Sequence, residues 1–119
     1  MPRILVGVVA LVFIACSSPT DPLTVTNTGT ESLRLVNKTA ESIYYFAVEA
    51  GAASLINWAP CTDPALCKQV PPHGVSDIPY DQIALYTPAA RQAIVYWWHL
   101  RPDGGSFRPD SIRASGAEL

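Results

Sequence analysis

Turn-forming residues divide the chain into short segments and leave little room for helices. The 119 residues include 11 prolines and 7 glycines, and beyond residue 22 no stretch repeats apolar residues at helical spacing. β-branched and aromatic residues instead gather in short runs, several of which alternate with polar residues. We therefore predict strands at Leu23–Thr26, Leu33–Lys38, Ile43–Val48, Ser54–Trp58, Val75–Ile78, Gln82–Tyr86, Ala93–Leu100 and Ser111–Ala114.

Short strands separated by turns are typical of two antiparallel sheets packed face to face. Residues 23–119 are about the size of one immunoglobulin-like sandwich. The Cys–Trp–Cys core pattern of true immunoglobulin domains is missing, so a fibronectin-III-like or generic Greek-key arrangement fits better. Between strands we expect a helical turn at Thr87–Arg91 and a hairpin turn at Arg101–Gly105. The prediction is an all-β antiparallel β-sandwich of about seven or eight strands.

Charge and motifs narrow the classes of function. The net charge is −2, from 8 Lys and Arg against 10 Asp and Glu, so a nucleic-acid-binding face is not expected. The chain has no Gly-rich phosphate loop, no G-x-S-x-G, no HExxH and only two histidines. We expect no cofactor, no metal and no enzymatic activity.

An uncharged apolar run, Ile4–Ala15, follows a short positive N-terminus that contains Arg3. As a helix its 12 residues would span about 18 Å, well short of the roughly 30 Å hydrocarbon core of a bilayer. A secretory signal therefore fits better than a transmembrane helix.

The run closes with Phe13-Ile14-Ala15-Cys16, and Ser17 follows. This ending resembles the lipobox of bacterial lipoproteins, with Phe13 where that motif usually carries Leu. The resemblance implies that residues 1–15 are a removed signal peptide and that Cys16 is lipidated on its sulfur and its freed amine. Several acyl chains make a stable membrane anchor. Ser17 in place of Asp implies the outer membrane if the organism is Gram-negative, and in any case a bacterial cell envelope.

Residues 16–22 then comprise the lipidated Cys16 and a short tether. Ser17–Pro22 reaches about 20 Å at most, so the domain at 23–119 would lie close to the lipid surface. The alternative is an ordinary secreted protein with a free Cys16, which would expose a reactive thiol in an oxidising compartment.

Cys61 and Cys67 are the two other cysteines, and in an exported chain they predict a structural disulfide. The bridge closes about seven residues, worth about 2.4 kcal/mol by chain entropy. A redox role is disfavoured because the spacing is not C-x2-C and no Lys, Arg or His lies between them. Joined with His73 and His99 they match no common metal-site spacing. Trp58 is close enough in sequence to pack on the bridge.

The aromatic strand around Trp97 offers the best candidate for a binding face. Side chains alternate along a strand, so we expect one side to be core, namely Ile94, Tyr96, Trp98 and Leu100. The other side carries Trp97, His99 and Arg101, and an exposed Trp among polar groups can seat a sugar ring or a partner side chain. The alternative is that Trp97 packs within the protein, and a buried Trp97 would remove the argument for this face.

Two short patterns that could indicate function are better interpreted as structural. Asn37-Lys38-Thr39 matches the N-glycosylation sequon, but we interpret Asn37 and Thr39 as residues of the turn after the second strand. Asp77 and Asp81 lie four residues apart around a bend and are interpreted as separate surface acids.

The sequence thus favours a membrane-anchored envelope lipoprotein whose small sandwich is a non-catalytic binding or interaction module. Its partners would be the membrane, through the lipid, and an envelope protein or glycan. The alternatives are a purely structural envelope protein without a ligand, and a metal-dependent periplasmic enzyme using Asp77 and Asp81 or a Cys/His site.

Replacing Cys16 tests the anchor. Cys16→Ser removes the sulfur that would carry the diacylglyceryl group, so the protein is expected to leave the membrane fraction. Fractionated cells measure this, with Ser17→Ala as the control that stays in the membrane. A Cys16→Ser protein that stays in the membrane fraction means that the lipoprotein interpretation is wrong.

Overall fold

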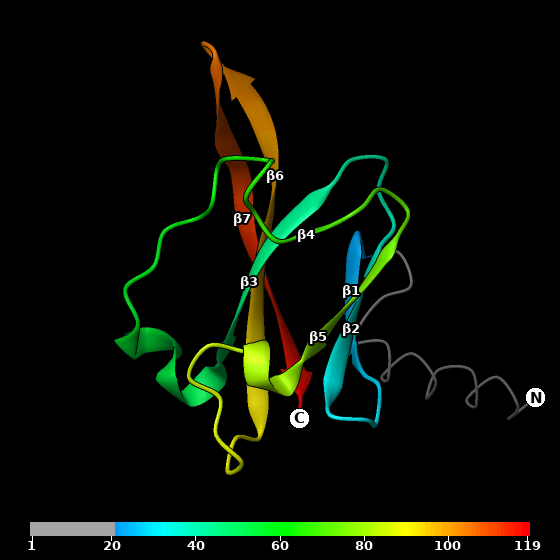
Figure 1. The fold of residues 1–119 in the computed structure, drawn as a ribbon, viewed down its shortest axis with the longest axis vertical. Coiled ribbons are helices and arrows are strands. Elements are labelled where there is room, and N and C mark those ends of the chain that lie inside the picture. Colours follow the sequence, from blue (N-terminus) through cyan, green and yellow to red (C-terminus); the bar gives the residue numbers. More distant parts are fainter. Residues whose placement is uncertain (1–20) are drawn as a thin grey trace, which may run out of the picture.

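Two antiparallel sheets face each other in the computed structural model, which describes residues 21–119, so Cys16 lies outside the described residues (Figure 1). One sheet has the order β1-β2-β5 and the other the order β4-β3-β6-β7. The predicted all-β antiparallel sandwich is confirmed. The strands are β1 (Leu23–Asn27), β2 (Ser32–Asn37), β3 (Ile43–Glu49), β4 (Gln69–Val70), β5 (Val75–Pro79), β6 (Gln92–Asp103) and β7 (Ser106–Glu118).

The short strand β4 determines how the described strands divide between the sheets. Ile43 of β3 pairs with Val70 of β4, so β4 joins the sheet of β6 and β7. The resulting division is three strands in one sheet and four in the other. In immunoglobulin constant-type domains the fourth strand instead lies in the sheet of the first, second and fifth strands, next to the fifth.

The strand predicted at Ser54–Trp58 is wrong. Ala50–Leu55 form a 3-10 helix, η1, and the chain then continues without regular structure. Glu49 caps this helix, because its carboxylate oxygens accept hydrogen bonds from the backbone N–H groups of Gly51 and Ala52, both at 2.9 Å. A run of small residues after a capping carboxylate favours a turn of helix over a strand.

The strand predicted at Gln82–Tyr86 is also wrong. A second 3-10 helix, η2, occupies Tyr80–Gln82, and beyond it only Ala84 makes a bridge, a parallel one to Val48. At the predicted helical turn the N–H of Ala90 donates to the carbonyl of Thr87 at 2.9 Å, which closes one turn.

The hairpin of β6 and β7 is longer than the sequence predicted, and its far end extends beyond the rest of the sandwich (Figure 1). The turn between the strands is only Gly104-Gly105, with φ of 57° and 90°. Positive φ at both central residues matches the twist of a hairpin and favours glycine. The expected five-residue turn thus shrinks to two residues.

A β-bulge interrupts the hairpin where it leaves the sandwich. Trp97 pairs with Arg113 but His99 pairs with Asp110, so β7 holds one residue more than β6 at this point. Ser111 takes the left-handed conformation there, with φ of 52°. Such a bulge bends an edge strand and disrupts the row of backbone groups that another chain could pair with.

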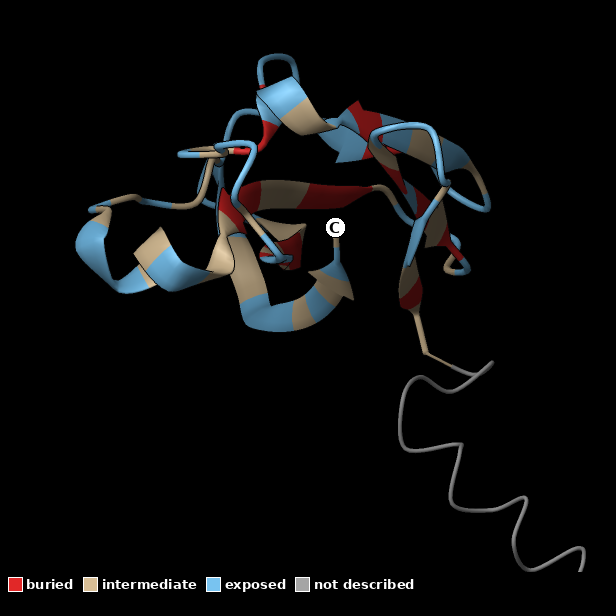
Figure 2. Cartoon of the chain, turned by 90° about the horizontal axis from the view of Figure 1, so that it is seen from below, coloured by how far each residue is buried: buried red, intermediate tan, exposed pale blue. Residues whose placement is uncertain are grey.

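The main core lies between the two sheets, where the buried stretches of strand face each other (Figure 2). β6 contributes Ala93, Val95 and Trp97 to it, and the opposite sheet contributes Leu33 and Leu35. The predicted sides of β6 are therefore reversed, because Trp98 belongs to a second cluster on the outer face of the four-stranded sheet. The alternation of side chains along β6 did not reveal which side faces the other sheet, because both sides carry apolar residues and both are covered.

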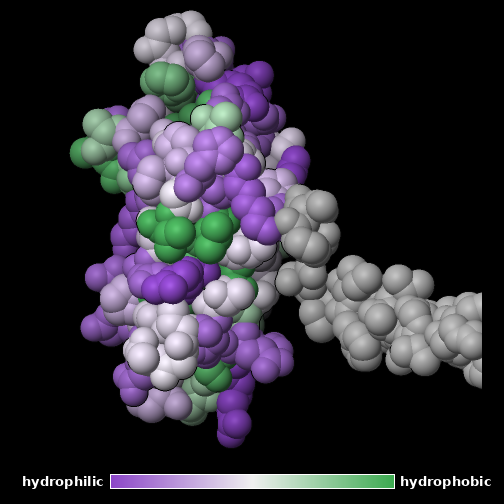
Figure 3. All heavy atoms as spheres, turned by 90° about the vertical axis from the view of Figure 1, so that its right-hand side faces the viewer, coloured by the Kyte–Doolittle hydropathy of each residue, from purple (hydrophilic) through white to green (hydrophobic). Residues whose placement is uncertain are grey.

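The surface on the side of β1 and β2 is mainly hydrophilic, with hydrophobic atoms in small separate patches (Figure 3). Exposed apolar residues scattered in this way are normal for a folded domain and do not mark an interface.

Asn37 is the polar side chain that the described fold buries most completely, at 1% exposure. Its amide nitrogen donates to the carbonyls of Glu41, Val70 and Pro71 at 2.8–3.1 Å. Its oxygen accepts from the backbone N–H of Thr39 at 2.8 Å and from the Thr39 hydroxyl at 2.7 Å. The interpretation of Asn37 and Thr39 as turn residues is confirmed, and the sequon asparagine is inaccessible in the folded protein.

Asn37→Ala should lower the free energy of unfolding by about 3 kcal/mol, because it leaves several buried backbone groups unpaired. Urea denaturation measures the change. The matched control is Asn57→Ala, at an exposed asparagine, which should cost less than about 0.5 kcal/mol. Equal effects of the two variants would show that the Asn37 network does not hold the turn.

Candidate binding site

Trp97 does not form an exposed face, and that part of the prediction is wrong. Its side chain belongs to the core and is 4% exposed. The indole N–H donates to the Ser115 hydroxyl at 3.2 Å, and the Arg113 guanidinium lies 5.2 Å from the ring centroid. Polar partners at the rim therefore cap a ring that packs between the sheets, which removes the argument for a binding face centred on Trp97.

Arg101 lies on the same side of β6, farther along the projecting hairpin, and its guanidinium is already paired. Its Nη1 donates to both carboxylate oxygens of Glu41 at 2.9 Å, and its Nε lies 3.1 Å from the Asp110 carboxylate. These hydrogen bonds fix the side chain against two acids. Arg101 thus ties β6 to β7 and to the loop before β3, and does not offer an unpaired cation to a ligand.

His99 lies between Trp97 and Arg101 and is half-buried. Its Nε2 is 3.2 Å from the Thr39 hydroxyl, so it extends the Asn37 network to the hairpin. Burial lowers the pKa of His99, and the Glu41 carboxylate acts in the opposite direction. The three predicted face residues are neighbours in space, but they serve packing, turn fixation and ion pairing.

The predicted disulfide between Cys61 and Cys67 is confirmed, with the two Cα atoms 5.6 Å apart. The bridged sulfurs are not thiolate ligands, and within residues 21–119 no three His, Cys, Asp or Glu side chains group to hold a metal ion. Asp77 forms a two-point ion pair with Arg34 at 2.9 and 3.1 Å, which lowers its pKa, the opposite of what a general acid needs.

The bridged segment, Cys61–Cys67, is called the disulfide loop below, and hydrogen bonds hold its shape. The carbonyl of Asp63 accepts from the N–H groups of Leu66 and Cys67 at 2.9 and 3.0 Å, and its carboxylate accepts from the N–H of Ala65 at 3.0 Å. The Gln69 side chain donates to the carbonyl of Pro64 at 3.3 Å. The loop is therefore a closed, internally bonded turn.

Aromatic packing fixes this loop to the outer face of the four-stranded sheet. The indole N–H of Trp98 donates to the carbonyl of Cys61 at 3.1 Å, and Cys67 packs in the same cluster. Trp58 lies 4.9 Å from the ring centroids of both Phe46 and Tyr96, and 5.9 Å from that of Trp98. The segment leading to the disulfide is thus held by ring stacking, and Trp58 belongs to the same apolar cluster as Cys61 and Cys67.

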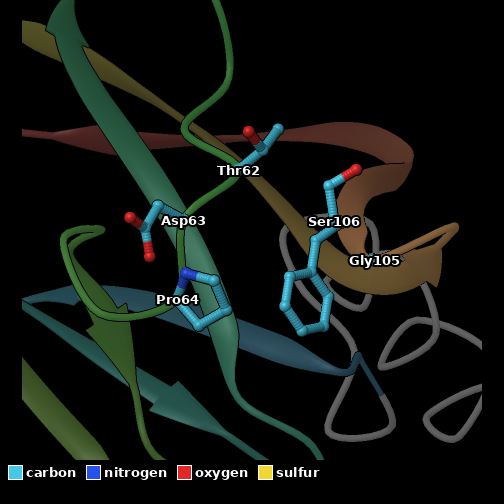
Figure 4. Close-up of a pocket in the computed structure, with 6 residues that line it drawn as sticks. Thr62, Asp63, Pro64, Gly105 and Ser106 are labelled. Atoms are coloured by element: carbon cyan, nitrogen blue, oxygen red, sulfur yellow. The ribbon is translucent and has the colours of Figure 1, made fainter.

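A hollow of about 340 Å³ lies where the disulfide loop meets the tip of the hairpin. Figure 4 shows that Thr62, Asp63 and Pro64 form one wall while Gly105 and Ser106 stand on the other. Phe107, 41% exposed, also lines it. The loop runs up to the projecting part of the hairpin, so segments about 40 residues apart in sequence meet there (Figure 1).

Polar atoms in the hollow remain available to a ligand. One carboxylate oxygen of Asp63 holds the loop, whereas the other, like the Thr62 hydroxyl, has no hydrogen bond within the described part of the chain. The Ser106 hydroxyl donates to the carbonyl of Asp103 at 3.0 Å and can still accept a hydrogen bond. The hollow therefore combines an aromatic ring with donors and acceptors.

The sequence predicted the disulfide, which closes a loop that contains Thr62 and Asp63, but it did not indicate what lies beside this loop, and it did not identify Phe107. The signal that points to this region comes from the structure. The stretch 50–68 joins β3 to β4 with only one short 3-10 helix, and connections of this length in a small domain are commonly functional.

The chain matches no protein-family model, and no curated protein or solved structure was found to match it. Within residues 21–119, no helix has the length and apolar character needed to cross a membrane.

The lowered pKa of His99 makes stability depend on pH. Because burial holds this pKa below its ordinary value of 6.5, the unfolded chain binds the proton more tightly than the folded one. The free energy of unfolding should therefore fall as the pH drops through the region below 6.5. Urea titrations between about pH 8 and pH 5 measure this slope.

His99→Gln should flatten that part of the profile, while His73→Gln, at an exposed turn residue, should leave it in place. A His99→Gln profile as steep as that of the wild type would contradict the assignment of the slope to His99.

Proposed function

We propose that this protein is a bacterial envelope lipoprotein, anchored through lipid on Cys16, whose sandwich is a non-catalytic binding module. The hollow between the disulfide loop and the hairpin tip is its binding site, in place of the face predicted around Trp97. The observation that carries the proposal is that two distant segments, each held rigidly, meet around an exposed aromatic ring and unengaged polar atoms.

The way the chain enters the fold limits the reach that the proposed lipid anchor would have. The carbonyl of Pro22 accepts from the N–H of Lys38 at 2.8 Å, and Leu23 is buried directly after it. A tether of Ser17–Pro22 would therefore have about 20 Å of reach and no slack from a loosened first strand. The domain would work close to the lipid surface, where envelope proteins and glycans are its available partners.

A binding role accounts for features that a purely structural role leaves unexplained. The disulfide loop does not pair with a strand, and Leu66 at its tip is 79% exposed. The hairpin likewise extends past the core and carries Phe107 beyond it. Ordering the exposed parts of these segments, the loop tip at Leu66 and the end of the hairpin, costs conformational entropy without burying much apolar surface. A binding role explains this cost, because the two ordered segments form the walls of a preformed site, and a ligand then binds without having to order them.

The residues that line the hollow favour binding over catalysis. They include one carboxylate, on Asp63, and two hydroxyls, on Thr62 and Ser106, but no Lys, Arg, His or free thiol. General acid–base or nucleophilic catalysis needs a second group that activates the first. A purely structural envelope protein without a ligand is the competing interpretation, and it predicts that nothing enters the hollow.

Capture from envelope extract tests the proposal. Full-length protein in detergent is immobilised, and the retained protein and sugar are quantified for wild type, Phe107→Ser and Leu55→Ser. Phe107 lines the hollow, whereas Leu55 is an exposed leucine outside it, so each change removes one exposed apolar side chain. We expect Phe107→Ser to reduce specific retention at least about tenfold and Leu55→Ser to leave it unchanged. Equal retention by all three proteins would contradict the proposed site and favour the structural alternative.

A further inference from the structure

We propose that the hollow binds a neutral pyranose ring of an envelope glycan. This inference rests on the proposed function, since it names the ligand of the same site. The structural feature that carries it is the exposed ring of Phe107 on the opposite wall from Pro64, with the hydroxyls of Thr62 and Ser106 and the carboxylate of Asp63 at the edges of the hollow.

The aromatic ring provides the first half of sugar recognition. One side of a pyranose presents C–H groups, which pack on the face of an aromatic ring. Phe107 follows the hairpin turn, and its backbone is fixed by pairing with Pro102 of β6. At 41% exposure its ring keeps free surface. Pro64 adds an apolar ring on the opposite wall, so both walls have a surface suited to C–H groups (Figure 4).

The polar atoms provide the second half. Sugar hydroxyls both donate and accept, so they need a mixture of acceptors and hydroxyl groups on the protein. The Asp63 carboxylate lies beyond Pro64 as seen from Phe107 (Figure 4), so the oxygen that does not hold the loop is a charged acceptor at the edge of the hollow, and hydrogen bonds to charged acceptors are the stronger kind. Thr62 offers a hydroxyl from the same wall and Ser106 one from the other. An apolar peptide side chain would bury these groups without partners, which costs affinity.

Size and charge restrict the ligand further. A volume of about 340 Å³ is at the lower end of ligand sites and suits one or two sugar rings. The lining has one negative charge and no positive one, and Asp103 stands at the hairpin end beside Ser106. Phosphorylated or acidic sugars would be repelled, so the expected ligand is neutral.

The rigidity of both walls explains how an open site can bind. The disulfide, the hydrogen bonds to the carbonyl of Asp63 and the bond from Trp98 to Cys61 fix one wall. The pairing of Phe107 with Pro102 and of Ser106 with Asp103 positions the other. Neither wall must be ordered when the sugar arrives, which lowers the entropic cost of binding.

Titration with defined sugars tests the inference. The probes are neutral oligomers of N-acetylglucosamine, glucose and galactose, with a sulfated oligosaccharide as the anionic comparison. Ligand-observed NMR on the full-length protein in detergent measures the dissociation constants. We expect saturable binding of at least one neutral oligomer and much weaker binding of the sulfated one.

Three variants separate a sugar from an apolar peptide. Phe107→Trp keeps an aromatic face and should bind at least as tightly as wild type. Phe107→Leu keeps apolar bulk without that face and should weaken binding about tenfold. Asp63→Asn should also weaken binding, whereas Leu66→Ala, on the same loop but outside the hollow, should not. Thermal unfolding of each variant confirms that it is folded.

Saturable binding of none of the neutral oligomers, or Phe107→Leu binding as tightly as wild type, overturns the inference. If capture from envelope extract still depends on Phe107 in that case, the proposed function stands and the ligand is a protein. If neither sugar binding nor capture depends on Phe107, the proposed function falls as well.

Discussion

Both faces of β6 are covered by other parts of the protein, and the arrangement of the other elements follows from this. On one face Val95 and Trp97 pack against the three-stranded sheet. On the other, Trp98 lies under the segment that leads to the disulfide loop. In so small a sandwich, the outer face of each sheet would normally be exposed to water. Here the outer face is covered by Trp58 and the bridge, so a long loop becomes a fixed part of the fold.

This constraint also shows how far the sequence can predict the structure. Two-residue alternation and closely spaced turns gave β1, β2, β3, β5 and the hairpin of β6 and β7, because those strands follow local propensity. The pairing of Cys61 with Cys67 followed from their number and the expected compartment. Local patterns do not reveal which side of a doubly covered strand meets the second sheet, so the sides of β6 were reversed.

The errors at Ser54–Trp58 and Gln82–Tyr86 have a related cause. Both segments contain strand-forming residues, but neither finds a neighbouring edge along its length, and Trp58 is used to cover a sheet. Phe107 was missed for a different reason. Its significance comes from meeting Pro64 across a hollow, and a contact between segments so far apart in sequence has no local signature. The sequence therefore predicted the disulfide loop, but not that the hairpin tip lies beside it and completes the candidate site.

The hairpin brings the fold and the proposed site together. The bulge at Ser111 and the ion pairs of Arg101 hold it as it leaves the core, so its tip stands at a fixed place beside the disulfide loop. The residues first considered as a binding face thus support the hairpin that carries the proposed site, and the proposed site lies at the end of this strand pair instead of at Trp97. With the proposed lipid anchor and its short tether, such a site would face neighbouring envelope components.

The account's central claim is the location of binding, and residue-resolved NMR tests it most directly. Amide signals of the isotope-labelled full-length protein are recorded while envelope extract is added. The account predicts shifts confined to the two walls, at Thr62, Asp63, Gly105, Ser106 and Phe107. Shifts centred on His99 and Arg101, or no shifts at the walls, would contradict it.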